Sequence, residues 1–379
     1  MIMFVFELNN LYKRLMKYNW QFPEWPEFHY EIAGVQDLIL KFIEKTGRTD
    51  GLLSTLPETE KTETIIDLMV SEALTSAAIE GEMLSRPDVM SSIKKNLGLH
   101  AKPEKTGDQR AEGIAELLVC VRNSFKKPLS KEMLFNWHSM LMKGAVKIQV
   151  GTWRTHKEPM LIVSGSIGNE TVHFEAPPST AVPAEIKRFI SWFNRTDKTI
   201  QSFPVKAAIA HLYFESIHPF EDGNGRIGRA LSEKALSQGF GYPVLLSLSQ
   251  AIETDRTGYY AALKQAQRSL NATEWIEWFV RTLITAQQQA ETQIEFAVRK
   301  TKFYTRINGM KLNERQLKVL HRMLKEGSNG FQGGMSAKKY MVIAKTSKPT
   351  ATRDLQALVE YGVLISSGGG RSTNYQISL

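Results

Sequence analysis

The chain has 379 residues, 42% hydrophobic and 23% charged, which is typical of a soluble globular protein with two or three domains. No apolar run approaches the roughly 20 residues that span a bilayer, and the opening MIMFVF lacks the features of a signal peptide. The single cysteine, Cys120, excludes an internal disulfide framework and suits a reducing compartment. We therefore expect a cytoplasmic protein without membrane association.

The net charge of +9 is unevenly distributed along the chain. Residues 301–379 contain 13 Lys and Arg against 4 Asp and Glu, whereas residues 1–300 contain 35 of each sign. The positive charge therefore belongs to the C-terminal segment and indicates a polyanionic partner there.

Residues 1–109 are predicted to form a helical N-terminal extension. The loop NWQFPEWPEF is rich in Trp and Pro and is expected to pack against the rest of the protein. Residues 62–79 are apolar at helical spacing and contain neither Gly nor Pro, so they predict one long helix. Ser85-Arg86-Pro87 then starts another helix.

The end of the long helix carries an unexpected carboxylate. Glu80 follows a run of small and apolar residues, and helical spacing directs it to the same side as Ala73 and Ala77. A charge on an apolar face costs several kcal/mol unless it is paired. The sequence therefore predicts that a cation from elsewhere in the chain meets Glu80.

Residues 110–290 are expected to form the central domain. Two amphipathic helices fall within 110–144, and Ser130 is predicted to cap the second. Residues 160–176 contain short β-prone runs around a glycine-containing turn, which indicates a hairpin. Helices are expected again near residue 184 and at 204–217, 226–237, 258–269 and 273–305.

Residues 310–379 look like a separate domain, joined through a helical linker at 291–309. Three helices followed by two short strands is the order of a winged helix, a variant of the helix-turn-helix. Thr350, Thr352 and Arg353 lie early in the third helix, where a recognition helix meets DNA, and GGGR is a candidate wing.

The stretch HPFEDGNGRIGR, residues 218–229, brings together several residues that can bind a ligand or take part in a reaction. Gly223 and Gly225 let the backbone approach a ligand closely just before a helix begins. The free N–H groups and positive dipole end of that helix make an anion site. Arg226 and Arg229 are three residues apart and point the same way.

Two guanidinium groups beside an anion site favour a ligand with several phosphates. Asp222 offers an oxygen ligand to a Mg²⁺ ion that bridges those phosphates. His218 can accept a proton near neutral pH, as a general base must.

Simpler interpretations exist for each part of this stretch. A Gly-Asn-Gly alone is usually a turn, and two arginines at this spacing usually form a solvated helix face. His211 and His218 are seven residues apart without a third ligand, which argues against a metal pair. No Gly-Lys-Ser/Thr follows, so the stretch is not a P-loop.

Taken together, the residues resemble the Fic-domain signature His-x-Phe-x-Asp/Glu-Gly-Asn-Gly-Arg-x-x-Arg at every defined position. The resemblance implies a helical core that transfers AMP from ATP to a hydroxyl of a protein side chain. It implies that His218 is the base, that Asp222 holds Mg²⁺ and that Phe220 is a core anchor. The implied nucleotide-binding residues are Gly223, Asn224 and Gly225 in the anion hole, Arg226 on the phosphates and Arg229 on the γ-phosphate.

Two further segments resemble the family. The hairpin at 160–176, with its ending HFEAPP, resembles the flap that aligns a target protein by strand addition. GYYAAL resembles the segment near adenine, so that Tyr260 and, less directly, Tyr259 would border the base. A related branch that transfers phosphate lacks the Gly-Asn pair and the last arginine, all of which this chain keeps.

The stretch Ser76-Ala-Ala-Ile-Glu80-Gly81 resembles the inhibitory motif of the family, Ser/Thr-x-x-x-Glu-Gly/Asn. The resemblance implies that Glu80 pairs with Arg229 and blocks the γ-phosphate site, while Ser76 holds the inhibitory helix by hydrogen bonding. Some inhibited members also remove AMP from targets, and the sequence does not separate the two directions.

We therefore expect a mainly α fold with a helical Fic core, a hairpin flap, an N-terminal helical extension and a C-terminal winged helix. The expected function is a self-inhibited protein adenylyltransferase that uses ATP and Mg²⁺. The alternatives are a DNA-binding regulator whose core senses nucleotide, and a variant that removes AMP or transfers phosphate. The sequence does not identify the target protein. It is compatible with a homodimer.

Overall fold

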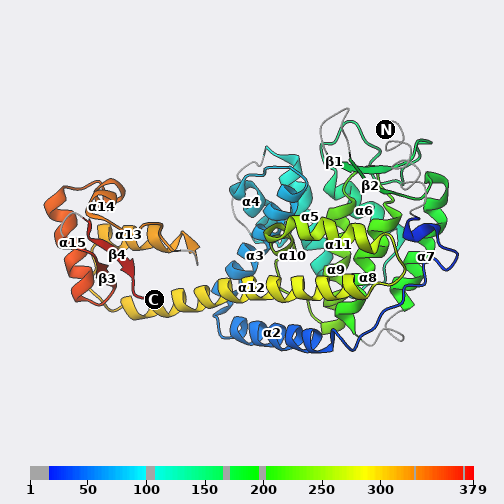
Figure 1. Cartoon of the computed structure of the whole chain (residues 1–379). Coiled ribbons are helices and arrows are strands. Elements are labelled where there is room, and N and C mark those ends of the chain that lie inside the picture. The colour runs from blue at the N-terminus through cyan, green and yellow to red at the C-terminus, as the bar shows by residue number, and fades with distance from the viewer. Residues whose placement is uncertain (1–16, 100–106, 165–170, 196–201, 328–329, 370–371) are drawn as a thin grey trace, which may run out of the picture. The chain divides into compact units, whose positions relative to one another are not determined.

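The computed structural model describes residues 17–99, 107–164, 171–195, 202–327, 330–369 and 372–379. The fold is mainly helical, as predicted, and the strands within the described residues form two separate two-stranded sheets. The chain divides into two compact units (Figure 1). We call residues 1–47 and 65–289 the large unit, and residues 48–64 and 290–379 the C-terminal unit.

The elements of the large unit are mostly helices of moderate length. Its helices are η1 Asn19–Gln21, α4 Arg86–Asn96, α5 Gln109–Ser124, α6 Lys131–Leu141, η2 Ser179–Ala181, α7 Val182–Arg195, α8 Phe203–Ile217, α9 Asn224–Phe240, α10 Leu248–Thr254 and α11 Arg256–Ala266. Its strands are β1 Leu161–Ser164 and β2 Thr171–Glu175. Helices α2 Gln36–Ser54, α3 Glu58–Ile79 and α12 Thr273–Ile307 contribute residues to both units. Within the described residues, no helix combines the length and apolarity needed to cross a membrane.

Helix α3 confirms the long helix expected before Glu80 and starts four residues earlier than predicted. Glu58 and Glu60 in its first turn favour this start because carboxylates stabilise the positive end of a helix dipole. The predicted cap of α6 is also present, since the Ser130 hydroxyl accepts a hydrogen bond from the backbone N–H of Met133 at 3.1 Å.

The hairpin expected at 160–176 has its two strands, β1 and β2, paired antiparallel with an irregularity between Ile162 and Val163. The residues that join these strands, 165–170, lie outside the described residues. The same holds for residues 1–16 of the predicted N-terminal extension.

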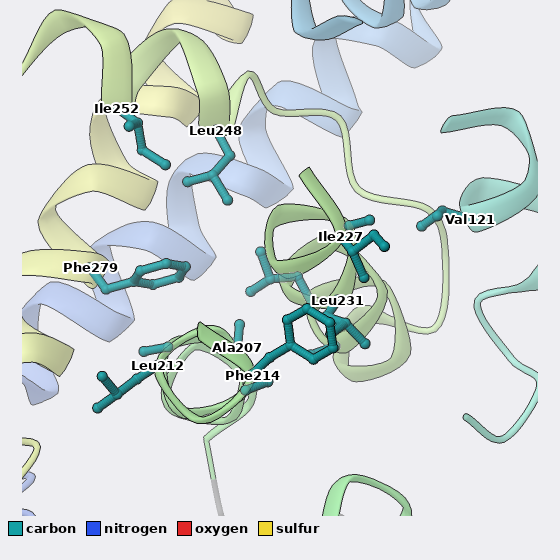
Figure 2. Packing of buried hydrophobic residues seen from close by; sticks show 14 of the residues in the cluster. Val121, Ala207, Leu212, Phe214, Ile227, Leu231, Leu248, Ile252 and Phe279 are labelled. Atoms are coloured by element: carbon teal, nitrogen blue, oxygen red, sulfur yellow. The ribbon is translucent and has the colours of Figure 1, made fainter. Parts of the chain in front are cut away.

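The core of the large unit joins the N-terminal helices and the central helices in one hydrophobic cluster. Helix α8 is buried on every side, as an all-round apolar helix should be, and packs along α9 (Figure 1). Figure 2 shows this packing, with Phe214 of α8 next to Ile227 and Leu231 of α9. Helices α8 and α9 therefore form a rigid support for the loop that connects them.

The Trp/Pro-rich loop packs against this core, as predicted. Trp25 is buried, and its indole meets the ring of Tyr213 edge to face with a centroid distance of 5.0 Å. Its indole N–H donates to the Glu185 carboxylate at 2.8 Å.

The C-terminal unit has the predicted order of three helices and two strands. These elements are α13 Glu314–Leu324, α14 Ala337–Ala344, α15 Lys348–Glu360, β3 Leu364–Ser367 and β4 Asn374–Ile377. The half-exposed Arg315 and the buried Tyr340 both donate to the carboxylate of Asp354, at 2.9 and 3.0 Å, and so tie α13 and α14 to α15. Residues 370–371 of the GGGR stretch lie outside the described residues.

Candidate active site

Side chains of the loop between α8 and α9 hold its conformation. His218 ends α8 in a left-handed conformation, with φ 48° and ψ 61°, and Gly223 precedes α9 with φ 81°. The Asn224 amide accepts from the backbone N–H of Phe220 at 3.0 Å and donates to its carbonyl at 2.9 Å. The buried Phe220 ring stacks on His138 at 4.0 Å. The loop is thus fixed before any ligand arrives.

The N-terminus of α9 lies against the end of α3. A Cβ atom on Gly225 would come within 2.6 Å of Glu80 Oε1 and 3.3 Å of Arg229 Nη1. Only a glycine therefore lets a carboxylate approach the first turn of α9 this closely. The first N–H groups of a helix have no intrahelical partner, so this position suits an anion.

Arg229 is buried, and its guanidinium contacts the last turn of α3 and Glu80, which follows that helix. Nε and Nη2 donate to the Ser76 hydroxyl at 3.2 and 3.0 Å, and Nη2 also donates to the Ser76 carbonyl at 3.1 Å. The same Nη2 lies 3.0 Å from Glu80 Oε1. Burial by itself would lower the pKa of the Arg229 guanidinium, but Glu80, Tyr259 and Glu72 together outweigh burial and raise that pKa.

Arg226 is also buried and meets a second carboxylate. Its Nη1 lies 2.8 Å from Glu82 Oε1, and its Nη2 lies 3.5 Å from Asp222 Oδ1. Glu82 follows Glu80 by two residues, so one short segment supplies a carboxylate to each of the two arginines. This second pair was not predicted from the sequence.

The turn at Gly81 explains how both carboxylates reach α9. Gly81 has φ 82°, its N–H donates to the Ala78 carbonyl, and the N–H of Glu82 donates to the Ala77 carbonyl, each at 3.0 Å. These two bonds and the left-handed residue are the Schellman motif that ends many helices. The glycine required by this conformation thus ends α3 at Ile79, so that Glu80 directly follows the helix and the chain changes direction at Gly81.

A third carboxylate on the same face of α3 anchors the helix. Glu72 is buried one turn before Ser76, and it accepts from the backbone N–H of Ser249 at 3.0 Å and from the Ser247 hydroxyl at 3.4 Å. These donors lie at the start of α10. Burial raises the pKa of the Glu72 carboxyl, although the serine hydrogen bonds and the charge of Arg229 act against this.

His218 keeps its strained backbone through contacts on both sides. Its N–H donates to the Phe214 carbonyl at 2.9 Å, and its own carbonyl accepts from Arg154 Nε at 2.7 Å. Arg154 is buried, and its Nη2 also donates to the Pro177 carbonyl at 2.5 Å, which connects the loop with the chain after β2. Burial lowers the pKa of Arg154 to about 10.

The two tyrosines of GYYAAL have different environments. Tyr259 is buried, and its hydroxyl lies 2.9 Å from His211 Nε2. Tyr260 is exposed, and the guanidinium of Arg256 lies 5.9 Å from its ring centre. Of the two rings, Tyr260 is the one open to a ligand from solvent.

Asp222 is the residue expected to bind Mg²⁺. Its side chain is 56% exposed, and Oδ1 accepts from the backbone N–H of Gly223 at 2.6 Å. Within the described ranges, no group of three or more His, Cys, Asp or Glu residues could hold a metal ion by itself. A single accessible carboxylate still fits Mg²⁺, which proteins often bind through one or two carboxylates and the phosphates of the substrate.

Three residues of the site escaped prediction. Glu82 directly follows Glu80 and Gly81 in the sequence, but its contact with Arg226 depends on the turn at Gly81. Arg154 is distant in sequence and acts on backbone carbonyls, which leave no pattern. Glu215 was detectable as the acidic residue in a mainly apolar helix, the same signal that Glu80 gave.

Two family models match the chain. A model of the Fic/DOC family matches residues 128–236, which include the loop between α8 and α9. A model of a domain of unknown function (DUF4172) matches residues 18–99, which include Glu80 and Glu82.

Individual relatives match a part of the chain. A probable protein adenylyltransferase of Aquifex aeolicus is 37% identical over 94 residues, 25% of this chain and 27% of the relative. The match thus spans about a quarter of that relative's length. A Fido domain-containing protein of Dictyostelium discoideum is 34% identical over 114 residues, 28% of this chain and 76% of the relative.

A solved structure is similar over most of the chain. The crystal structure of a Fic family protein from Desulfovibrio desulfuricans superimposes with a TM-score of 0.55, covering 93% of this chain and 98% of the other. With 20% sequence identity, this similarity concerns the fold.

Proposed function

The chain belongs to the Fic/DOC family, and we propose that it is a protein adenylyltransferase that moves AMP from ATP to a Ser, Thr or Tyr hydroxyl of a target protein or of itself. The observation that carries this proposal is the pair of buried guanidinium groups, Arg226 and Arg229, beside the N-terminus of α9, with His218 at the start of the same loop. The Aquifex relative, named a probable protein adenylyltransferase, supports it.

ATP would bind with its phosphates at the N-terminus of α9. The backbone N–H groups of Gly223, Asn224 and Gly225 would form the anion hole, and Arg226 and Arg229 would neutralise the phosphates. Asp222 would hold Mg²⁺, and the ion would supply positive charge that neutralises the phosphates.

His218 would act as the general base. Its Nε2 takes the proton of the target hydroxyl while the hydroxyl oxygen attacks the α-phosphorus. The bond from the α-phosphorus to the bridging oxygen breaks, and pyrophosphate leaves with that electron pair. General bases of this kind contribute roughly 10²- to 10⁴-fold to the rate.

The flap would position the target. Strands β1 and β2 form a two-stranded sheet, and an extended target segment can add to its edge by backbone hydrogen bonds. Leu161 and Val172 on these strands are exposed and offer apolar contacts for such a segment.

The end of α3 would inhibit the enzyme. Glu80 occupies the guanidinium of Arg229, which is the proposed partner of the γ-phosphate, and Ser76 holds the same guanidinium from a second side. Glu82 occupies Arg226 in the same way. ATP phosphates must compete with two carboxylates that are already in place, so the resting protein would bind ATP in an unproductive pose or weakly.

The test uses ATP labelled at the α-phosphate. We expect Glu80→Gly to incorporate label into itself or a lysate protein at least about tenfold faster than the parent, since a coupling of 1–3 kcal/mol is common for such regulation. His218→Ala in the same background should abolish the incorporation. Glu60→Gly, which puts a glycine on an exposed turn of α3, is the matched control for helix weakening.

The same experiment separates the alternatives. Incorporation from γ-labelled but not from α-labelled ATP would mean phosphate transfer, and loss of label from a previously modified protein would mean removal of AMP. Equal, low incorporation by the parent and Glu80→Gly would contradict the inhibitory role of Glu80.

DNA binding by the C-terminal unit is a second candidate function. The order α13, α14, α15, β3 and β4 suits a winged helix, and residues 301–379 carry the excess positive charge of the chain. Lys348 and Arg353 are exposed on the first half of α15. The hydroxyls of Thr350 and Thr352 bond within the start of α15, to Ser347 and to the Lys348 carbonyl.

The affinity of the whole protein for random duplex DNA across a salt series tests this candidate. Contacts to phosphates would make the affinity fall steeply with salt, and Lys348→Gln and Arg353→Gln should each lower that slope by about one unit. An affinity that does not change with salt concentration would rule out DNA binding through phosphate contacts. Lys264→Gln, an exposed lysine of the large unit, is the control.

A further inference from the structure

Glu215 is a buried carboxylate next to His218 that the mechanism above leaves without a role. It lies on α8 three residues before His218, with a side chain that is 7% exposed. Its Oε2 lies 3.6 Å from His218 Nδ1. Across the described residues, neither His218 Nδ1 nor Glu215 Oε1 has a hydrogen-bond partner.

Unpaired polar atoms in such a place are costly. A buried donor or acceptor without a partner loses about 1–3 kcal/mol, and more when it is charged. A small rotation would bring His218 Nδ1 and Glu215 Oε2, now 3.6 Å apart, into hydrogen-bonding distance and would give Nδ1 a partner. Catalytic hydrogen bonds are often long in ligand-free structures and shorten when substrate is bound.

The backbone holds the imidazole in this position. His218 adopts a left-handed conformation that costs a residue other than glycine about 1–2 kcal/mol. The bonds from Arg154 to its carbonyl and from its N–H to Phe214 preserve that conformation. Residues strained in this manner cluster at functional sites, where the surrounding structure determines them.

Helix α9 leaves room for the Glu215 carboxylate. A Cβ atom on Gly228 would come within 2.8 Å of Glu215 Oε1 and 3.3 Å of the His211 ring. Gly228 sits between Arg226 and Arg229, where the proposed phosphate contacts give no reason for a glycine. The close approach of Glu215 supplies that reason.

The groups around Glu215 keep it ionised. It faces His211 from its own helix, Arg229 from α9 and Tyr259 from α11. Burial by itself would raise the pKa of the Glu215 carboxyl, but His218, His211 and Arg229 together outweigh burial and lower it. Burial lowers the pKa of the His211 imidazole, whose Nε2 lies 2.9 Å from the Tyr259 hydroxyl.

We propose that Glu215 is the positioning residue of His218: its carboxylate accepts the Nδ1 proton and so leaves Nε2 free to act as the base. This role rests on the proposed function. When Nε2 takes the proton of the target hydroxyl, the Nδ1 proton stays in the bond to Glu215, and the carboxylate stabilises the imidazolium that forms. The arrangement follows the logic of a base oriented by a buried acid.

The kinetic test compares Glu215→Gln with its parent in the uninhibited Glu80→Gly background. We expect kcat for AMP transfer to fall roughly 10²-fold, the lower range for a general base, while KM for ATP stays within about twofold. Glu253→Gln, an exposed glutamate of α10, is the matched control.

Gly228→Ala is a second variant that displaces the carboxylate without removing it. It should lower kcat in the same direction, because the new methyl group pushes Oε1 away. An unchanged kcat for Glu215→Gln, or a loss confined to KM and thermal stability, would overturn the positioning role.

Nitrogen-15 NMR of labelled histidine provides a readout that does not depend on activity. With His218 assigned by its absence in His218→Ala, the proposal requires the Nδ1–H tautomer in the parent and a shift toward Nε2–H in Glu215→Gln. A parent in the Nε2–H form would overturn the proposal. If the Glu80→Gly background transfers no AMP, the proposed function fails, and the tautomer still decides whether Glu215 holds the Nδ1 proton.

Discussion

At the scale of single residues, the segment from Glu80 to Glu82 determines how the site is covered. The left-handed turn at Gly81 separates two carboxylates that reach different arginines, Arg229 and Arg226. Both guanidinium groups are buried, so loss of either carboxylate would leave a buried charge poorly compensated. In the proposed mechanism, ATP would offer the same compensation through its phosphates, so the carboxylates and the nucleotide would compete.

The contribution of Glu82 is testable by substitution. We expect Glu82→Gln to raise AMP incorporation above the parent but less than Glu80→Gly, because Arg226 is released while Arg229 stays occupied. The initial rate with α-labelled ATP measures this order. Met83→Gln, at an exposed neighbouring position, should match the parent. A Glu82→Gln rate equal to that of the parent would show that Glu82 does not restrain the enzyme.

Adding one methyl group at Gly81 should lower the stability of the protein. Nothing lies within 4 Å of an added Cβ, so the cost of Gly81→Ala arises from its φ of 82° and amounts to about 1–2 kcal/mol. Urea unfolding of the two proteins measures this cost. Gly241 also has a positive φ, 79°, at the end of a helix and open space around an added Cβ. Gly241→Ala should therefore lower the free energy of unfolding by a similar amount, and it should leave AMP incorporation unchanged.

The sequence predicted part of this arrangement. An isolated carboxylate on an apolar helix face indicated that Glu80 has a distant cation, and the structure has Glu80 at Arg229. Glu82 was not predictable in the same way, since two residues along a helix point to nearly opposite sides. Its contact depends on the end of α3, and helix ends are less certain from sequence than helix interiors.

At the scale of elements, α9 and α10 differ from the prediction. Helix α9 begins at Asn224, two residues earlier than expected, although Asn and Gly are weak helix formers. The two bonds of the Asn224 side chain to the Phe220 backbone make up for this weakness. Helix α10 was not predicted because its seven residues are too few to show a period.

The contact between α5 and α9 offers a stability prediction. The buried ammonium of Lys234 on α9 donates to the carbonyls of Ser124, Phe125 and Lys127 at the end of α5, at 3.0, 2.8 and 2.6 Å. Lys234→Met should lower the free energy of unfolding by about 3 kcal/mol, since bonds to a charged group are lost and carbonyls are left unpaired.

Urea unfolding followed by tryptophan fluorescence measures that loss. Lys264→Met removes an exposed lysine from α11 and should change stability by less than about 0.5 kcal/mol. Equal stabilities of Lys234→Met and the parent would mean that water replaces the ammonium at the end of α5.

At the scale of the whole molecule, pH should affect stability through buried acids of the large unit. Glu233, Glu72 and Arg122 line one small pocket. Burial, together with repulsion from Glu72, raises the pKa of the Glu233 carboxyl from 4.5 to about 8. The folded state therefore binds a proton that the unfolded state has released between these two pH values, and the free energy of unfolding falls as pH rises through this window.

Glu233→Gln should remove the part of this fall that belongs to Glu233. One proton accounts for at most about 1.4 kcal/mol per pH unit, and the partial exposure of Glu233 to solvent reduces the effect. The free energy of unfolding in urea at about pH 5 and about pH 8 should thus differ less for Glu233→Gln than for the parent. Some decline should persist, because burial also raises the pKa of Glu72. For the control Glu253→Gln, the free energy of unfolding should fall with pH as much as it does for the parent. An equal fall for Glu233→Gln would mean that Glu233 binds its proton no more tightly in the folded protein than in the unfolded chain.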